Sequence, residues 1–83
     1  MNKLLIYQYI NKIKKEDIKN FGLSQNIYLT NQEIDIIYNN LKNKTEDIFN
    51  NPLQLINDIK DKVSISVYNK MLELYNQYKD FIK

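Results

Sequence analysis

The sequence contains no histidine, cysteine, arginine, alanine or tryptophan, and it has a single glycine. Without histidine and cysteine, the chain cannot build a Ser–His or Cys–His nucleophilic system, and it lacks the usual ligands of zinc and haem. Without cysteine, it also cannot form a disulfide to reinforce a small core. One glycine cannot make a glycine-rich phosphate-binding loop. These absences predict a protein that is not an enzyme and that holds no cofactor and no metal ion.

The residues that are present indicate one small folded domain. The chain has 83 residues, of which 43% are hydrophobic, and its net charge is +2. This length predicts a single helical domain over residues 1–83 with a thin core, and the apolar content argues against disorder. Asn, Ile, Lys and Tyr are enriched. Because these four residue types share A/T-rich codons, we interpret the bias as that of a low-GC bacterium.

No part of the sequence is apolar enough to cross a membrane, which takes about 20 consecutive apolar residues. The start, "MNKLLIYQYINKIKK", has the outline of a signal peptide, but Gln8 interrupts its apolar run and no small-residue cleavage site follows. We therefore expect a cytoplasmic protein that makes no membrane contact.

Apolar residues recur at helical spacing along nearly the whole chain. Ile6, Tyr9, Ile10 and Ile13, for example, share one face of a helix. The run "VSISVY" alternates like a strand, but it is short and leads into a strongly helical pattern, so we interpret it as a helix start. The predicted fold class is all-α, a compact bundle of four to five short helices with no sheet. The predicted helices lie near 2–13, 15–21, 31–43, 52–62 and 65–82.

Two helix boundaries near the middle of the chain have clear local signals. Gly22 follows the second helix, where a glycine in the left-handed conformation typically ends a helix. Thr30 and Glu33 form a capping box for the third helix, and Leu29 with Ile34 forms the matching hydrophobic staple.

The most individual stretch, "TEDIFNNPLQL", raises the question of whether it is a site or a joint between helices. Asn51 is a favoured N-cap, Pro52 suits the first helical position, and Gln54 stands where a reciprocal capping side chain belongs. Ile48 and Phe49 are apolar because the connector must fold back onto the core. We interpret the stretch as a structural joint, so that Asn51→Ala should cost about 0.5–2 kcal/mol through the lost cap.

Two pairs of carboxylates have simpler explanations than chemistry. Asp58 and Asp61 share a helix face, but no calcium-loop spacing surrounds them, and Lys62 is a favourable surface partner for Asp58. Glu46 and Asp47 stand in a first helical turn, where negative charge is favourable.

Nucleic-acid binding is the alternative function. Residues 1–22 carry five lysines against two acids. Against this alternative, the helix predicted over 31–43 opens with acids at Glu33 and Asp35, and no arginine is present to read guanine. We interpret the seven tyrosines as core and margin residues rather than as a stacking platform. A weak nucleic-acid-binding accessory protein therefore remains possible but is less favoured.

The order of these features resembles a known family. The stretch "IYLTNQEIDIIYNNLKNKTEDIFNN", a helix ending in "LINDIKDKVS" and a tyrosine-rich last helix are similar to the YqfT-like family of short uncharacterised Bacillales proteins. The most specific elements are Leu29-Thr30, "DIFN" from Asp47 to Asn50, and the leucine–isoleucine pattern of the fourth helix. The resemblance covers nearly the whole chain. It implies a small helical cytoplasmic protein of unknown function, with no catalytic residues to carry over.

The last helix has more apolar surface than one packing face needs. Its apolar positions from Ile65 to Ile82 spread over roughly 200°, whereas one-sided packing needs a stripe of just over ~100°. Either this helix is central and covered on both sides, or one edge is an interaction patch. We therefore predict a protein–protein interaction module that binds a protein partner or forms a homodimer through this helix. The predicted contact residues are Tyr75, Tyr78 and Phe81.

Overall fold

The structure is a computed structural model that describes residues 3–79. Within them the chain forms six α-helices and one 3-10 helix, and no strand. In chain order these are α1 (Lys3–Lys12), α2 (Lys15–Ser24), α3 (Asn31–Asn43), α4 (Thr45–Asn50), α5 (Pro52–Asp58), η1 (Lys60–Lys62) and α6 (Ile65–Tyr78). The all-α prediction is confirmed. The number of α-helices exceeds the expected four to five because the predicted connector before Pro52 is itself a short helix.

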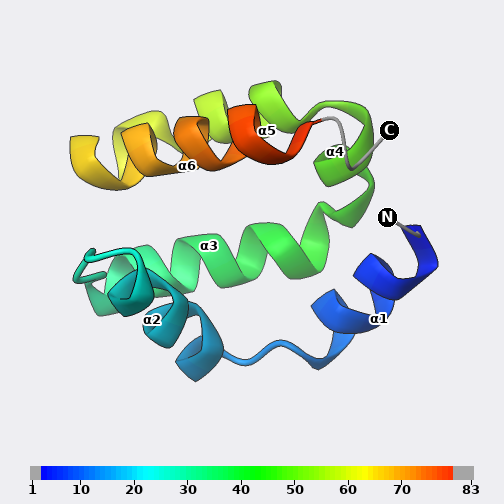
Figure 1. Cartoon of the computed structure of the whole chain (residues 1–83), viewed down its shortest axis with the longest axis horizontal. Coiled ribbons are helices and arrows are strands. Elements are labelled where there is room, and N and C mark those ends of the chain that lie inside the picture. Colours follow the sequence, from blue (N-terminus) through cyan, green and yellow to red (C-terminus); the bar gives the residue numbers. More distant parts are fainter. Residues whose placement is uncertain (1–2, 80–83) are drawn as a thin grey trace.

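The helices are arranged around α3 (Figure 1). α2 packs along one side of α3, and α1 lies near the C-terminal end of α3. α5 and α6 pack against each other on the opposite side. α3 and α6 both begin at the left-hand end of the view, and α4 turns the chain at the other end. This topology brings the starts of two helices that are distant in sequence to the same end of the molecule.

The core is small and is drawn from several segments. Its buried cluster consists of Ile18 from α2, Leu29 from the α2–α3 connection, Ile34 from α3 and Val67 from α6. Among the described residues, no side chain is completely enclosed. The core is therefore as thin as the chain length predicts.

The predicted capping box at the start of α3 is present. The backbone N–H of Glu33 donates to Thr30 Oγ1 over 3.1 Å, and the backbone N–H of Thr30 donates to Glu33 Oε1 over 3.0 Å. Leu29 and Ile34, the predicted staple, both belong to the buried cluster. The start of α3 is thus fixed by local hydrogen bonds and by the core together.

The second carboxylate oxygen of Glu33 makes a contact that no local pattern predicts. Glu33 Oε2 accepts a 2.7 Å hydrogen bond from the backbone N–H of Ser64. Ser64 is the N-cap of α6, and its hydroxyl accepts from the N–H of Val67 over 3.3 Å. Glu33 is only 6% exposed. A single buried carboxylate therefore joins the starts of α3 and α6.

Two opposing effects act on the pKa of Glu33. Burial acts to raise the pKa, because it disfavours the charged form. The hydrogen bonds that the carboxylate accepts from Thr30 and Ser64 outweigh burial and hold the pKa below its ordinary value. The folded protein therefore stabilises Glu33 in its charged form.

The expectation for Gly22 is wrong. α2 continues through Gly22 to Ser24, and Gly22 does not adopt a positive φ. Asn26, with φ 62°, takes the left-handed conformation instead, and asparagine tolerates this conformation better than most residues. Gly22 is needed for a different reason. A Cβ atom at this position would lie 2.9 Å from Leu29 Cδ1, a side-chain atom of the buried cluster.

The expected cap at Asn51 is also wrong, although Pro52 does begin α5 as predicted. The Asn51 side chain makes no capping hydrogen bond, and Gln54 donates to Asp58 instead. Asn51 is the single residue between α4 and α5, so it must both end one helix and begin the next. Its φ of −142° and ψ of 58° differ from the extended conformation of an N-cap. The stability loss expected from Asn51→Ala therefore has no structural basis.

The first prediction concerns Glu33. In Glu33→Gln, an amide NH₂ replaces one acceptor oxygen and leaves one of two backbone donors unpaired, so unfolding free energy should fall by about 1–3 kcal/mol. Urea denaturation measures the change, with the exposed Glu16→Gln as the matched control. The difference between wild type and variant should be largest above the unfolded-state pKa of about 4.3. It should shrink as the pH falls through the lowered folded-state pKa of Glu33. A difference that grows on acidification contradicts this role.

A second prediction concerns Gly22. Alanine in a helix interior is ordinarily more favourable than glycine by about 1 kcal/mol. At position 22 the added methyl group would lie 2.9 Å from Leu29 Cδ1 and 3.2 Å from the carbonyl oxygen of Ile27, so Leu29 must shift within the core. Overpacking of this kind typically costs about 1–3 kcal/mol. We therefore expect Gly22→Ala to lower the melting temperature, while Asn20→Ala on the same helix should not. A clear gain in stability from Gly22→Ala would show that Leu29 repacks freely.

Candidate partner-binding groove

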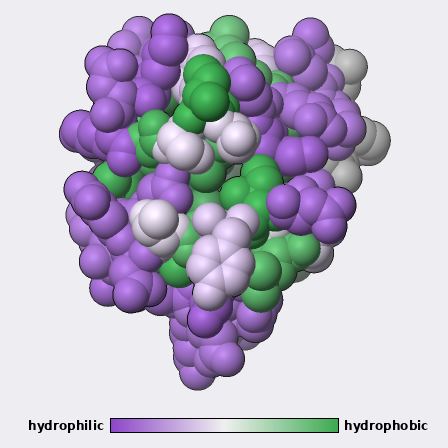
Figure 2. Space-filling model, turned by 90° about the vertical axis from the view of Figure 1, so that its left-hand side faces the viewer, coloured by the Kyte–Doolittle hydropathy of each residue, from purple (hydrophilic) through white to green (hydrophobic). Residues whose placement is uncertain are grey.

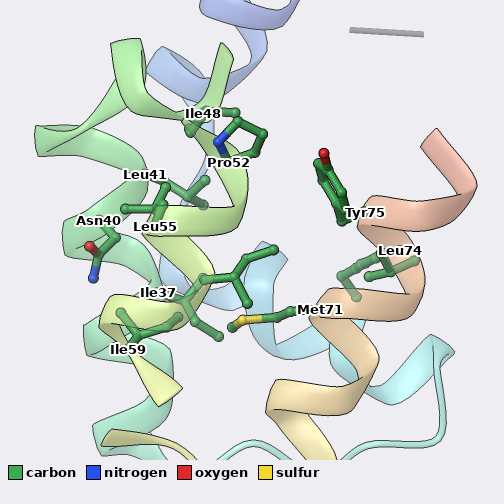
Figure 3. A pocket seen from close by; sticks show the side chains of 12 residues that line it. Ile37, Asn40, Leu41, Ile48, Pro52, Leu55, Ile59, Met71, Leu74 and Tyr75 are labelled. Carbon is green, nitrogen blue, oxygen red and sulfur yellow. The ribbon is translucent and has the colours of Figure 1, made fainter. Parts of the chain in front are cut away.

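An open apolar groove of about 410 Å³ lies between α6 and the pair formed by α3 and α5 (Figure 3). α3 and α5 form one wall, and α6 forms the other. The lining residues are Phe21, Ile37, Asn40, Leu41, Ile48, Pro52, Leu55, Ile56, Ile59, Met71, Leu74 and Tyr75.

The groove arises from helical periodicity. On α6, Met71, Leu74 and Tyr75 stand at i, i+3 and i+4, so they share one face. Pro52 and Leu55 of α5 and Ile59 just after it stand at i, i+3 and i+7, so they also share one face. Met71 reaches from α6 toward Ile37 on α3, as Figure 3 shows. Because Ile37 and Met71 also pack against the buried cluster, the inner part of the groove is continuous with the core.

The groove offers little to a polar ligand. Asn40 turns its amide to the helix backbone, where Nδ2 donates to the carbonyl oxygen of Ile36 over 2.7 Å. The hydroxyl of Tyr75 points away from Met71 (Figure 3). No charged side chain belongs to the lining. Such a surface suits apolar side chains.

The short helices α4 and α5 are acidic within their own bounds, and lysines adjoin them, Lys44 before α4 and Lys60 and Lys62 after α5. α4 and α5 carry Glu46, Asp47 and Asp58 and no lysine. Glu46 accepts a hydrogen bond from the hydroxyl of Tyr7 on α1. This hydrogen bond, with burial and the charge of Glu46 adding to it, raises the pKa of Tyr7. On α6, by contrast, Lys70 and Glu73 pair with each other over 3.2 Å.

Of the three predicted contact residues, the structure places one. Tyr75 is half-buried and lines the groove. The side chain of Tyr78 and all of Phe81 lie outside the described part of the chain, as does the predicted extension of the last helix beyond residue 79. Val67 is buried whereas Ile65 is 64% exposed, so the face of α6 that carries Val67 packs inward.

The groove residues on α3 and α5 were not predicted as a site. Their spacing indicates an apolar helix face, and it gives no sign of whether another element covers that face.

Seen from the end where α3 and α6 begin, hydrophobic atoms gather around a hollow inside a hydrophilic rim (Figure 2). At this end Ile65 and Tyr28 are exposed. The apolar content of the chain thus exceeds what its own fold covers.

Lys15 of the basic N-terminal stretch and Lys42 of α3 both make contacts within the fold. Lys15 Nζ lies 3.0 Å from Asp35 Oδ1. Lys42 Nζ donates to the carbonyl oxygens of Ile10 and Asn11 over 2.6 and 3.0 Å, at the end of α1. Both ammonium groups also lie 5.4 Å from the centre of the Tyr38 ring. Both ammonium groups are therefore engaged in contacts within the folded chain.

Within residues 3–79, acidic side chains do not gather into a group of three that could hold a metal ion. Over the same residues, none of the helices combines the length and apolar content that crossing a bilayer requires.

Comparison with known proteins gives no relative: no family model, no curated protein and no solved structure matches the chain. The resemblance to the YqfT-like family stays a prediction.

Proposed function

We propose that this protein is a non-enzymatic interaction module whose groove binds the apolar face of a helix from a protein chain. The observation that carries the proposal is the open apolar lining contributed by α3, α5 and α6. Helix-in-groove recognition uses apolar anchors at i, i+3 or i+4, and i+7. The groove supplies matching apolar walls on both sides.

The chemistry of the groove favours a helix over a small molecule. A small-molecule site usually combines apolar walls with a few converging polar groups that orient the ligand. Here the Asn40 amide is bonded to its own helix, and the Tyr75 hydroxyl points away from Met71. An apolar side chain gains about 1.5–3 kcal/mol from full burial, so two or three anchors suffice for a reversible complex.

Nucleic-acid binding has less support than protein binding. The absence of arginine removes the commonest guanine contact. Lys15, one of the five lysines in residues 1–22, pairs with Asp35 of the chain itself. Both features favour an interaction module.

Selection from a displayed library of randomised helical peptides tests the proposal. We expect enriched peptides with apolar residues at i, i+4 and i+7. Their affinity, measured by fluorescence polarisation, should fall by about tenfold or more in Leu55→Glu, because losing one buried anchor costs at least 1.4 kcal/mol. Leu53→Glu is the matched control, since Leu53 lies on the same helix, is 44% exposed and does not line the groove.

Tyr75→Lys serves as a second groove variant at a half-buried position, in case Leu55→Glu is too unstable to interpret. Circular dichroism establishes that each variant is folded before binding is compared. Peptides that bind folded Leu55→Glu and Tyr75→Lys as tightly as wild type would place the binding surface elsewhere. A library that yields no binder above background would remove the proposed function.

A further inference from the structure

Sulfur is scarce in this protein. The sequence has no cysteine, and its two methionines are Met1 and Met71. Met71 is therefore the one sulfur-bearing side chain within residues 3–79. A methionine thioether is readily oxidised to the sulfoxide, which turns a flexible apolar side chain into a polar one. The place of Met71 in the fold decides what that change does.

Met71 lies where an oxidant dissolved in water can reach it. Its side chain is half-buried and lines the open groove. Figure 3 shows this side chain extending from α6 toward Ile37, across the space between the two walls. On its inner side Met71 packs against the buried cluster. The thioether is thus part of the groove surface and is not enclosed in the core.

The groove gives little support to a polar group at position 71. The polar side chains of the lining are Asn40 and Tyr75. The Asn40 amide donates to the carbonyl oxygen of Ile36, and the Tyr75 hydroxyl points away from Met71. In the free protein, water in the open groove hydrates a sulfoxide oxygen. A bound helix replaces this water with apolar side chains and leaves the acceptor unpaired, which is costly.

We propose that Met71 is an oxidation site that regulates the groove, because its sulfoxide weakens the binding of an apolar helix face. This inference rests on the proposed function, and it names a chemical modification that acts on the same site. The sulfoxide oxygen is hydrated in the free protein and unpaired in the complex. Oxidation therefore disfavours the complex more than it disfavours the fold.

The oxidant is a peroxide, and hydrogen peroxide suffices. A lone pair of the Met71 sulfur forms a bond to one peroxide oxygen while the O–O bond breaks. The other oxygen leaves as hydroxide and takes the proton of the transferred hydroxyl group, so the products are the sulfoxide and water. The sulfur loses two electrons and the peroxide gains them. Methionine sulfoxide reductases reverse the modification.

Peroxide treatment followed by a binding measurement tests the inference. Mass spectrometry of proteolytic fragments locates the added oxygen, and fluorescence polarisation measures the affinity for a selected peptide that contains no methionine. We expect the Met71 sulfoxide to form in the folded protein and to lower peptide affinity by about tenfold or more. Circular dichroism should show that the oxidised protein remains folded. Reduction by methionine sulfoxide reductases A and B, one for each sulfoxide epimer, should restore the affinity.

Two substitutions at position 71 separate this site from other effects of peroxide. Met71→Leu keeps an apolar side chain of similar volume, and such an exchange usually costs little stability. This variant still contains Met1, so peroxide should leave its peptide affinity unchanged. Met71→Gln places a polar group in the groove and should weaken binding without peroxide. An equal loss of affinity in peroxide-treated Met71→Leu and wild type would overturn the inference, because it would trace the effect to another residue.

The rate of oxidation gives a second test. A helix seated in the groove covers Met71, so saturating peptide should slow the oxidation of Met71 several-fold. Oxidation of Met1, followed in the same sample, corrects for consumption of the oxidant. Equal rates of Met71 oxidation with and without peptide would overturn the inference, because they would show that the bound helix leaves the sulfur uncovered.

Other outcomes separate this inference from the proposed function. Peptides that bind the Met71 sulfoxide as tightly as the thioether overturn the regulation and leave the interaction module standing. A folded protein that keeps Met71 reduced while Met1 is fully oxidised has the same consequence. Unfolding on oxidation would assign Met71 to the core instead of the groove and would also overturn the regulation. A peptide library that yields no binder would remove both proposals.

Discussion

The buried carboxylate of Glu33 is the constraint from which the arrangement of the helices follows. Burying a charge is costly unless hydrogen bonds replace the lost water, and here the backbone amides of Thr30 and Ser64 replace it. These amides are among those that the first turns of helices leave unpaired. Because one donor belongs to the start of α3 and the other to the start of α6, satisfying the charge places both helix starts at one end. The groove between these helices depends on that placement.

A thin core explains why the groove stays open. The short helices α4 and α5 turn the chain back beside α6, and Ile37 and Met71 close only the inner part of the space between α3 and α6. Leu55 and Tyr75 are left half-covered on the walls. Within residues 3–79 no further helix lies over this space, so apolar surface that a larger domain would bury stays open there.

Local sequence patterns predicted the helix boundaries that short-range hydrogen bonds fix. They failed where a residue's conformation or role depends on how another segment folds or packs. The Thr30–Glu33 box and the limits of α3 depend on neighbouring residues, and both were predicted. The role of Gly22 depends on the approach of Leu29, and the conformation of Asn51 depends on α4 being a helix, so both expectations were wrong. The groove was missed for a related reason. A periodic apolar face on α5 has the same pattern whether another helix covers it or leaves it open.

α1 shows that a helical apolar pattern does not fix which face of a helix is buried. Ile6, Tyr9, Ile10 and Ile13 were expected to share one helix face, yet Ile10 is buried while Tyr9 is exposed. With Leu5 beside Tyr9, α1 has apolar residues on its outer side as well as on its inner side. Its own fold covers only one side, through α3 and α4. Which face of α1 is covered therefore depends on where α3 and α4 lie, and the apolar pattern of α1 alone does not fix it.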